Sequence, residues 1–170
     1  MDLLSTDRTV IKGIKETDGQ DVQDLYLNPM VRRYLGGSRK TDAIPAIIEA
    51  MLHSDEMSLY LVVREKDTND FIGLVSLDPH HDRKEFEISY QLLPQWWRKG
   101  FGTEIVKEIL FYAFHELNLR KVIAETQTAN VYSCRLLEST GMRLEKIVKR
   151  YGAEQSIYSL RANRPGFRKE

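Results

Sequence analysis

The sequence has little cysteine, no excess of charge and no long apolar run. Its 170 residues include one cysteine, Cys134, so no disulfide forms within the chain, and we interpret this residue as a small buried hydrophobe in a helix. Lys plus Arg total 25 and Asp plus Glu total 25, which gives no overall attraction to nucleic acid or to an anionic membrane. No apolar run approaches the ~20 residues of a membrane span. The first residues also lack a basic region followed by an apolar core. These absences predict a protein of the reducing cytoplasm that binds neither membrane nor nucleic acid directly.

The length favours a single domain, residues 1–170. A chain of this size buries roughly two-thirds of its unfolded surface, so it needs no disulfide or metal to hold it together. We find no internal repeat and no low-complexity linker. The sequence therefore predicts one domain with a full hydrophobic core.

The first third of the chain predicts a short strand followed by three helices. The strand is Thr9-Val-Ile-Lys-Gly-Ile14, and Asn28-Pro29 and Gly36-Gly37 separate the helices. Thr17 or Asp18 caps the first helix, Pro29 starts the second, and Thr41 or Asp42 caps the third. The apolar residues expected to face the core are Val22, Leu25, Tyr26, Met30, Val31, Tyr34, Leu35, Ile44, Ile47, Ile48, Met51 and Leu52.

Two β-rich runs, residues 57–63 and 71–77, are joined by a polar turn and predict an antiparallel hairpin. The connection 78–84 contains His80 and His81. Adjacent histidines without a nearby cysteine or a second histidine pair are poor ligands for one ion, so we interpret both as solvated loop residues. His53 and His115 receive the same interpretation, and no metal site is predicted.

A third strand leads into the most informative stretch of the sequence. Residues 86–92 alternate apolar and polar side chains, and Pro94 ends this strand. From about Gly100 to Leu117, apolar residues recur at helical spacing. The first turn of such a helix has unpaired N–H groups and the positive end of the helix dipole. Because Arg98, Lys99, Gly100 and Gly102 coincide with it, the stretch predicts a pyrophosphate site.

The glycines alone are weak evidence, because glycine often only marks a turn. A dinucleotide fingerprint requires a third glycine at position 105, which is isoleucine, and no Gly-Lys-Ser/Thr of a mononucleotide P-loop follows. Both nucleotide motifs are therefore excluded.

The last third predicts a strand over residues 121–127, a helix over 131–140 and a hairpin. Asn130 is suited to the helix N-cap and Gly141 to the C-terminal position. The hairpin pairs residues 142–149 with 155–160 around Tyr151-Gly152. Together the elements predict a mixed sheet covered by helices.

Two stretches are similar to the motifs of one superfamily. Tyr90-Gln-Leu-Leu-Pro-Gln-Trp-Trp-Arg-Lys-Gly-Phe-Gly-Thr-Glu104 resembles the coenzyme A pyrophosphate loop of the GNAT N-acetyltransferases, Arg/Gln-x-x-Gly-x-Gly/Ala, as found in the RimJ/RimL-type branch that acetylates ribosomal-protein N-termini. Asn130-Val-Tyr-Ser-Cys-Arg-Leu-Leu-Glu-Ser-Thr-Gly-Met142 resembles the family's Asn-x-x-Ser-x-Arg helix. Trp97 stands at the Arg/Gln position, and Arg98 stands where that branch commonly has glycine. The resemblance covers essentially the whole chain.

The resemblance implies a GNAT fold of class α/β (α+β), a mixed and mostly antiparallel sheet of six to seven strands flanked by helices. It also implies an acetyl-CoA-dependent N-acetyltransferase, working as a monomer or homodimer, that acts by direct attack on the thioester. The implied cofactor-binding residues are Leu92, Leu93, Arg98, Lys99, Gly100, Phe101, Gly102, Thr103, Asn130, Ser133 and Arg135. In the family a backbone N–H near Leu92-Leu93 polarises the thioester carbonyl.

Glu87 lies on the polar side of its strand with Ser89 and Gln91, where a partly buried carboxylate acts as a general base. The resemblance also implicates a glutamate at this position. Ser133 is the candidate acid for the leaving thiolate, with Tyr132 as competitor. The expected acceptor is a protein N-terminal amine. The alternatives are a small-molecule amine, such as a polyamine, amino acid or antibiotic, and a non-catalytic CoA-binding module of the same fold.

Overall fold

The strands of the described residues form one eight-stranded sheet, in the order β1-β2-β3-β4-β5-β6-β8-β7. The computed structural model describes residues 4–162. β1 pairs with β2, β2 with β3, β3 with β4, β6 with β8 and β7 with β8 in antiparallel registers, whereas β5 and β6 are parallel. The predicted mixed and mostly antiparallel sheet is thus confirmed. It has eight strands instead of six to seven because the two-residue strand β1 precedes the first predicted strand.

The element bounds follow the predicted elements closely. The strands are β1 Leu4–Ser5, β2 Thr9–Gly13, β3 Leu59–Glu65, β4 Phe71–Pro79, β5 Phe86–Leu92, β6 Lys121–Gln127, β7 Arg143–Arg150 and β8 Ala153–Arg161. The helices are α1 Gly19–Leu27, α2 Pro29–Arg32, α3 Ile44–Leu52, α4 Phe101–His115 and α5 Val131–Ser139, with short 3-10 turns at Glu16–Asp18, Thr41–Ala43 and Pro94–Trp96. Among the helices of the described chain, none is long and apolar enough to cross a membrane.

The chain divides into two compact units, each made of two segments. The first comprises Met1–Leu77 and Tyr90–Phe101, and the second comprises Asp78–Ser89 and Gly102–Glu170. Strands β4 and β5 therefore each contribute residues to both units. A single domain over residues 1–170 stays a prediction.

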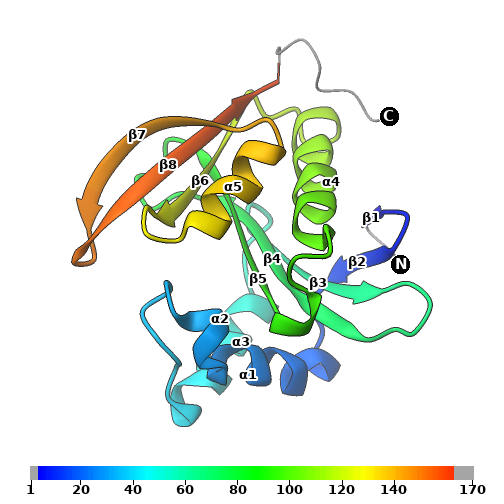
Figure 1. Ribbon diagram of the computed structural model, residues 1–170. Helices are drawn as coiled ribbons and strands as arrows, with labels where there is room; N and C mark the ends of the chain where they lie inside the picture. The colour runs from blue at the N-terminus through cyan, green and yellow to red at the C-terminus, as the bar shows by residue number, and fades with distance from the viewer. Residues whose placement is uncertain (1–3, 163–170) are drawn as a thin grey trace. The chain divides into compact units, whose positions relative to one another are not determined.

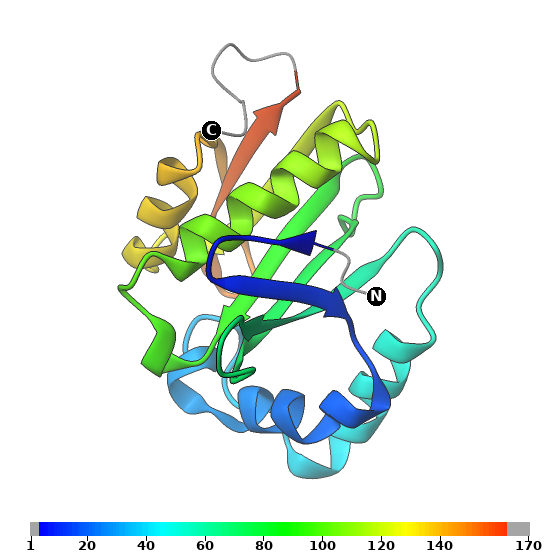
Figure 2. The same cartoon turned by 90° about the vertical axis from the view of Figure 1, so that its right-hand side faces the viewer.

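In the first unit, helices α1, α2 and α3 gather beside the strands that precede β5, and β1 runs beside β2 (Figures 1 and 2). The helical spacing of apolar residues in α1 and α3 supplies one side of a core, and the continuous apolar runs of β3 and β4 supply the other. The buried residues of this cluster are Val22, Leu25, Tyr26, Ile44, Met51, Val62, Phe71 and Leu74.

The second short helix departs from the predicted burial pattern. Met30 and Leu35 were expected in the core, but they are 59% and 44% exposed. Arg32 is buried instead, and its guanidinium donates to the carbonyl oxygens of Gly37 and Leu35 at 3.1 and 2.6 Å. The turn after α2 needs a donor for these carbonyls. The arginine therefore points inward and the two apolar residues point outward.

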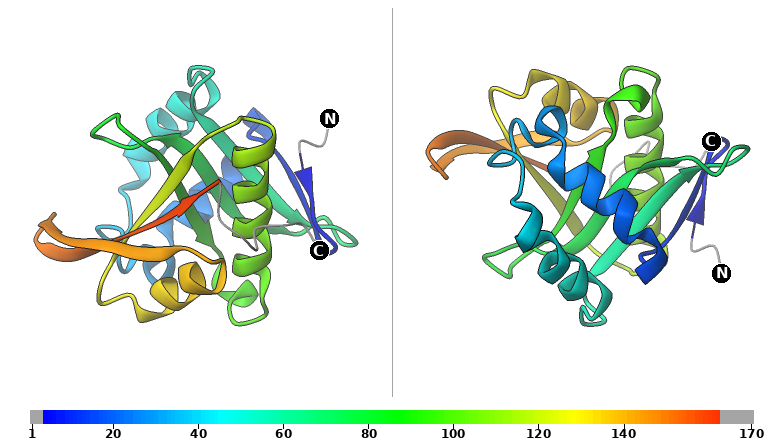
Figure 3. Two further views of the ribbon diagram at one scale, coloured as in Figure 1. Left: turned by 90° about the horizontal axis from the view of Figure 1, so that it is seen from above. Right: turned by 90° about the horizontal axis from the view of Figure 1, so that it is seen from below.

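In the second unit, α4 and α5 lie beside β6 and the β7–β8 hairpin. The hairpin forms a long curved ribbon (Figure 3). Residues at helical spacing on α4 are fully buried, as predicted, with Ile105, Ile109 and Ala113 at 0% exposure. Leu117, expected on the same face, lies beyond the end of α4 and is 38% exposed.

Candidate active site

Glu87 lies in β5 with its side chain 21% exposed. As predicted, it shares a side of the strand with Ser89, whose Oγ donates to Glu87 Oε1 at 3.1 Å. Burial raises the pKa of the Glu87 carboxyl from 4.5 to about 7, although the nearby His80 and the Ser89 hydroxyl act to lower it. The negative charges of Glu125 and Asp78 raise this pKa further. A carboxylate in this state is suited to exchange protons near neutral pH.

The sequence predicts that His80 is a solvated loop residue. This prediction is wrong, because His80 is only 3% exposed. Its ring faces three carboxylates. Nε2 lies 2.8 Å from Glu125 Oε2 and 3.2 Å from Glu87 Oε2, and Nδ1 lies 3.1 Å from Asp82 Oδ1. Burial acts to lower the pKa of His80, but the hydrogen bonds to Glu125 and Asp82 and the charge of Glu87 outweigh it, and the pKa is raised. His81, His53 and His115 are exposed, as expected.

A positive side chain completes this cluster from β7. Arg150 Nε lies 3.0 Å from Glu125 Oε1, and the same guanidinium contacts His81. The ligand atoms of His80, His81 and Glu125 lie within 4.8 Å of one another. Arg150 already places a positive charge beside Glu125 and His81, so the grouping does not favour a metal ion. The absence of a metal stays a prediction.

The basic glycine turn has the backbone expected of a ligand-binding loop. Helix α4 starts at Phe101, one residue after the predicted start. Arg98 has φ of 57° and Gly100 has φ of 83°, both in the left-handed region that favours glycine. Position 98 thus has a backbone conformation that glycine adopts more readily than arginine. The indole N–H groups of Trp96 and Trp97 hold the preceding turn by donating to the carbonyls of Phe71 and Leu92, at 3.0 and 2.8 Å.

Arg8 contacts this turn, and no pattern in the sequence predicts the contact. It lies between β1 and β2, and its Nη1 donates to the carbonyl oxygen of Lys99 at 3.0 Å. Its guanidinium lies over the Phe101 ring, 3.9 Å from the centroid, and a Cβ added at Gly100 would approach its Nη2 to 3.3 Å. Arg8 therefore adds a third cation, beside Arg98 and Lys99, to the start of α4.

The two candidate backbone donors at the end of β5 differ. The N–H of Leu93 donates to the carbonyl of Ile72 in β4 at 2.9 Å. Because backbone N–H groups alternate sides along a strand, the N–H of Leu92 points away from β4. Leu92 is therefore the better placed of the two for a thioester carbonyl. The register of β5 with β6 covers only Phe86 with Val122 and Glu87 with Ile123.

Helix α5 begins as predicted, with Asn130 Oδ1 accepting the N–H of Ser133 at 3.2 Å. Ser133 is 9% exposed and Tyr132 is 45% exposed, so the two candidate acids differ in access to solvent. Arg135 is exposed on the same helix. Cys134 is only partly buried, less than the sequence suggested. Thr103 of α4 shares a hydrogen bond of 2.9 Å with Ser139 of α5, so its hydroxyl already has a partner.

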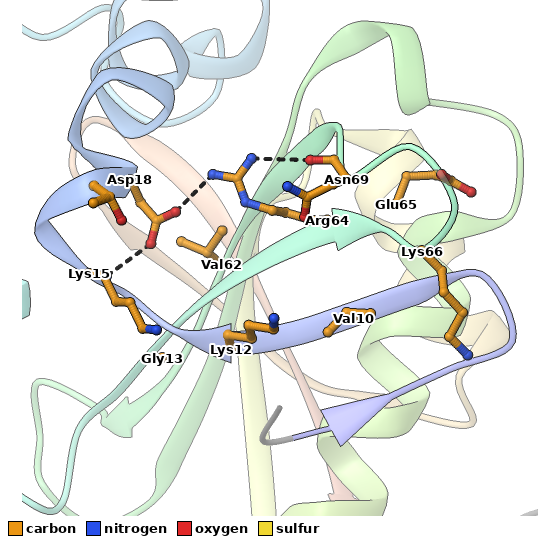
Figure 4. A pocket seen from close by; sticks show the side chains of 11 residues that line it. Val10, Lys12, Gly13, Lys15, Asp18, Val62, Arg64, Glu65, Lys66 and Asn69 are labelled. Carbon is orange, nitrogen blue, oxygen red and sulfur yellow. Dashed lines mark hydrogen bonds and ion pairs between the residues drawn. The ribbon is translucent and has the colours of Figure 1, made fainter. Parts of the chain in front are cut away.

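The first unit also contains a basic hollow of about 350 Å³, which includes none of the predicted site residues (Figure 4). Lys12, Lys15 and Lys66 line it beside Arg64. The guanidinium of Arg64 lies 2.8 Å from Asp18, so its charge is already compensated. The hollow shows no feature that selects a ligand.

Comparison with known proteins identifies the family. The sequence model described as "Acetyltransferase (GNAT) domain" matches residues 8–143. The chain is 29% identical to the uncharacterized N-acetyltransferase YoaA of Bacillus subtilis over 156 residues, 88% of this chain and 87% of that protein. The structure of spermidine N-acetyltransferase from Vibrio cholerae, in complex with CoA and spermine, has a TM-score of 0.78 at 19% identity and covers 92% of this chain and 97% of that chain.

The ribosomal-protein-S5-alanine acetyltransferase from Vibrio fischeri has a TM-score of 0.73 at 18% identity and covers 94% of this chain and 96% of that chain. Solved structures at such low identity show a shared fold, whereas the family model spans most of the sequence. The chain belongs to the GNAT acetyltransferase family, and it is an N-acetyltransferase whose acyl donor is acetyl-CoA.

Proposed function

We propose that the chain acetylates the α-amine of a protein or peptide N-terminus, with Glu87 as general base. Glu87 takes a proton from the acceptor ammonium, directly or through one water, and the neutral amine attacks the thioester carbon. The N–H of Leu92 stabilises the negative oxygen of the tetrahedral intermediate. When the C–S bond breaks, the coenzyme A thiolate takes a proton from Ser133 or Tyr132. The nitrogen of the new amide loses its second proton, which restores that hydroxyl.

The setting of Glu87 in β5 carries the proposal: its side chain is 21% exposed, its Oε1 accepts a hydrogen bond from Ser89 at 3.1 Å, and burial raises its pKa to about 7. An α-amino group has an ordinary pKa of about 7.7–8.0, whereas a lysine-type primary amine has a pKa of about 10.4. A base with a pKa of about 7 is therefore matched to an α-amine within about one unit. It is poorly matched to a lysine side chain or a polyamine. The fold does not choose between the acceptor classes, because the spermidine N-acetyltransferase and the ribosomal-protein-S5-alanine acetyltransferase both have it.

For the cofactor, we propose that the pyrophosphate binds at Arg98 to Thr103. Three features support this: the start of α4 at Phe101, the positive φ of Gly100, and the cations of Arg98, Lys99 and Arg8. Asn130, Ser133 and Arg135 occupy the corresponding positions of the resembling helix at the start of α5. A cytoplasmic location and a monomeric or homodimeric state belong to the same proposal.

A thiol-release assay with acetyl-CoA tests the proposal on three matched acceptors. These are a peptide with a free N-terminal alanine or serine, the same peptide blocked at its N-terminus and carrying one lysine, and spermidine. We expect the first to have a kcat/KM at least about tenfold above the others, which corresponds to ~1.4 kcal/mol. A preference for spermidine would overturn the acceptor class and leave the transferase standing. Release with none of them, in a folded protein that binds acetyl-CoA, would favour a non-catalytic CoA-binding module.

A further inference from the structure

We propose that His80 is a positioning residue for Glu87: it is held as an imidazolium between Glu87, Glu125 and Asp82, and it keeps the Glu87 carboxylate ionised and correctly oriented. This inference rests on the proposed role of Glu87 as the base. His80 itself touches neither of the reacting molecules in this account. It acts only through the carboxylate beside it.

The backbone fixes the ring of His80 in place. The N–H of His80 donates to the carbonyl of Glu85 at 2.8 Å, and its carbonyl accepts the N–H of Arg83 at 2.7 Å. The turn between β4 and β5 is thus closed by hydrogen bonds at His80. Since the side chain is 3% exposed, the ring has little freedom to leave the carboxylates.

The positions of the ring nitrogens indicate the charge of the ring. A neutral imidazole has one N–H donor, whereas the imidazolium has two. Here Nε2 shares a hydrogen bond of 2.8 Å with Glu125 Oε2 and lies 3.2 Å from Glu87 Oε2. Nδ1 lies 3.1 Å from Asp82 Oδ1, an ion-pair distance, without hydrogen-bond geometry. A neutral ring protonated at Nε2 would leave the buried lone pair of Nδ1 beside a carboxylate, whereas an imidazolium places positive charge within 3.2 Å of all three carboxylates.

The charges of the surrounding elements agree with a cation at this place. The carboxylates of Asp78 on β4, Asp82 on the turn, Glu87 on β5 and Glu125 on β6 act on the pair formed by His80 and Glu87. The positive group facing them from β7 is Arg150, which pairs with Glu125 and contacts the exposed ring of His81. With Arg150 alone, four carboxylates would share one positive charge. A second positive charge on His80 brings the cluster closer to balance.

A positive charge on His80 affects the ionisation of Glu87. Burial acts to protonate Glu87, and the positive charge of His80 opposes this. Removing that charge should raise the pKa of Glu87 further, so that less of the enzyme carries an ionised base at neutral pH. The ion pair also fixes one carboxylate oxygen, Oε2, and Ser89 fixes the other, Oε1.

The pH dependence of kcat/KM tests this with His80→Gln and the control His53→Gln. For His80→Gln we expect the acidic limb to move to higher pH by at least one unit, so that activity falls about tenfold at pH 6.5 and recovers at pH 9. His53→Gln should keep the wild-type midpoint, because His53 is exposed after α3 and pairs with Glu49. Asp82→Asn removes the partner of Nδ1 from a half-exposed position and should move the limb in the same direction by less. A loss of rate by an equal factor at every pH would mean a merely structural role and would overturn the inference.

Titration of the imidazole carbons by NMR tests the same coupling without any acceptor. In the wild type, His80 should titrate above its ordinary pKa of 6.5, and Glu87→Gln should lower that pKa, because the coupling between two sites is reciprocal. If Glu87→Gln leaves the His80 titration unchanged, the positioning role is wrong whatever the enzyme acetylates. If the titration moves but no acceptor is acetylated, the coupling stands and the proposed function fails.

Discussion

Replacement of Glu87 by glutamine should remove proton acceptance while preserving the shape of the site. The amide has nearly the size of the carboxylate, and its oxygen can still accept the 3.1 Å hydrogen bond from Ser89. A positioned general base contributes ~10²–10⁴-fold to the rate. Turnover of an α-amine acceptor at pH 7 should therefore fall about 100-fold or more. The affinity for acetyl-CoA should be unchanged, since we assign the cofactor to other residues.

Raising the pH should partly rescue this variant. An α-amine with a pKa near 8 is about one-tenth neutral at pH 7 and about nine-tenths neutral at pH 9. The acceptor then arrives without the proton that Glu87 would have removed. We therefore expect about a tenfold recovery between pH 7 and pH 9.

The assay is steady-state thiol release with calorimetric measurement of acetyl-CoA affinity on the same preparations. Glu85→Gln is the matched control, because Glu85 lies two residues earlier and pairs with Lys121 at 3.4 Å. It should change turnover by less than about threefold, as expected for a partly exposed ion pair. Near-wild-type turnover of Glu87→Gln at neutral pH, on an acceptor that the wild type clearly uses, would refute the reasoning and transfer the role to a water chain or another carboxylate.

Three further changes test other parts of the account. Arg8→Ala removes the guanidinium that contacts the Lys99 carbonyl and should weaken acetyl-CoA binding about tenfold by calorimetry. Arg8→Lys should recover only part of this loss, since lysine lacks the planar guanidinium. Equal affinity in the wild type and both variants would exclude Arg8 from the site. Asn130→Ala should cost about 1 kcal/mol in the free energy of unfolding, and Asn130→Ser should restore it, because a hydroxyl also caps the N–H of Ser133; if the affinity for acetyl-CoA does not also fall, the role of Asn130 is structural only. The folded-state pKa of Glu87, about 7, lies above the ordinary 4.5, so the folded chain holds this proton more tightly and loses stability as the pH rises from 4.5 to 7. Glu87→Gln should therefore gain stability relative to the wild type between pH 5 and pH 8. A difference in denaturant midpoint that stays constant with pH would contradict the raised pKa.

The local patterns of the sequence were sufficient for most of the fold. Alternation in β5 and helical spacing in α4 placed both elements within a residue or two, and Asn130 correctly marked the start of α5. The pattern failed at α2, where the sequence shows an apolar helix but the carbonyls of the following turn need the guanidinium of Arg32. That need depends on the turn geometry, which the spacing of apolar residues does not encode.

The contacts around the site were harder to predict. Glu87 was identified because it lies on the polar side of an amphipathic strand. His80 was missed because its partners are carboxylates of β5 and β6, and Glu125 of β6 lies 45 residues away in the sequence. One signal was available: a hairpin joining β4 to β5 places residue 80 opposite residue 85, two residues before Glu87. Arg8 had no such signal, because its contact with Lys99 spans 91 residues.

The most direct measurement is the site of acetylation on one peptide that carries both a free N-terminal alanine and an internal lysine. After incubation with acetyl-CoA and the enzyme at pH 7, tandem mass spectrometry locates the added acetyl group. The account predicts that it lies on the α-amine in the wild type and is nearly absent with Glu87→Gln. Acetylation of the lysine in preference to the α-amine, or equal acetylation by both proteins, would contradict it.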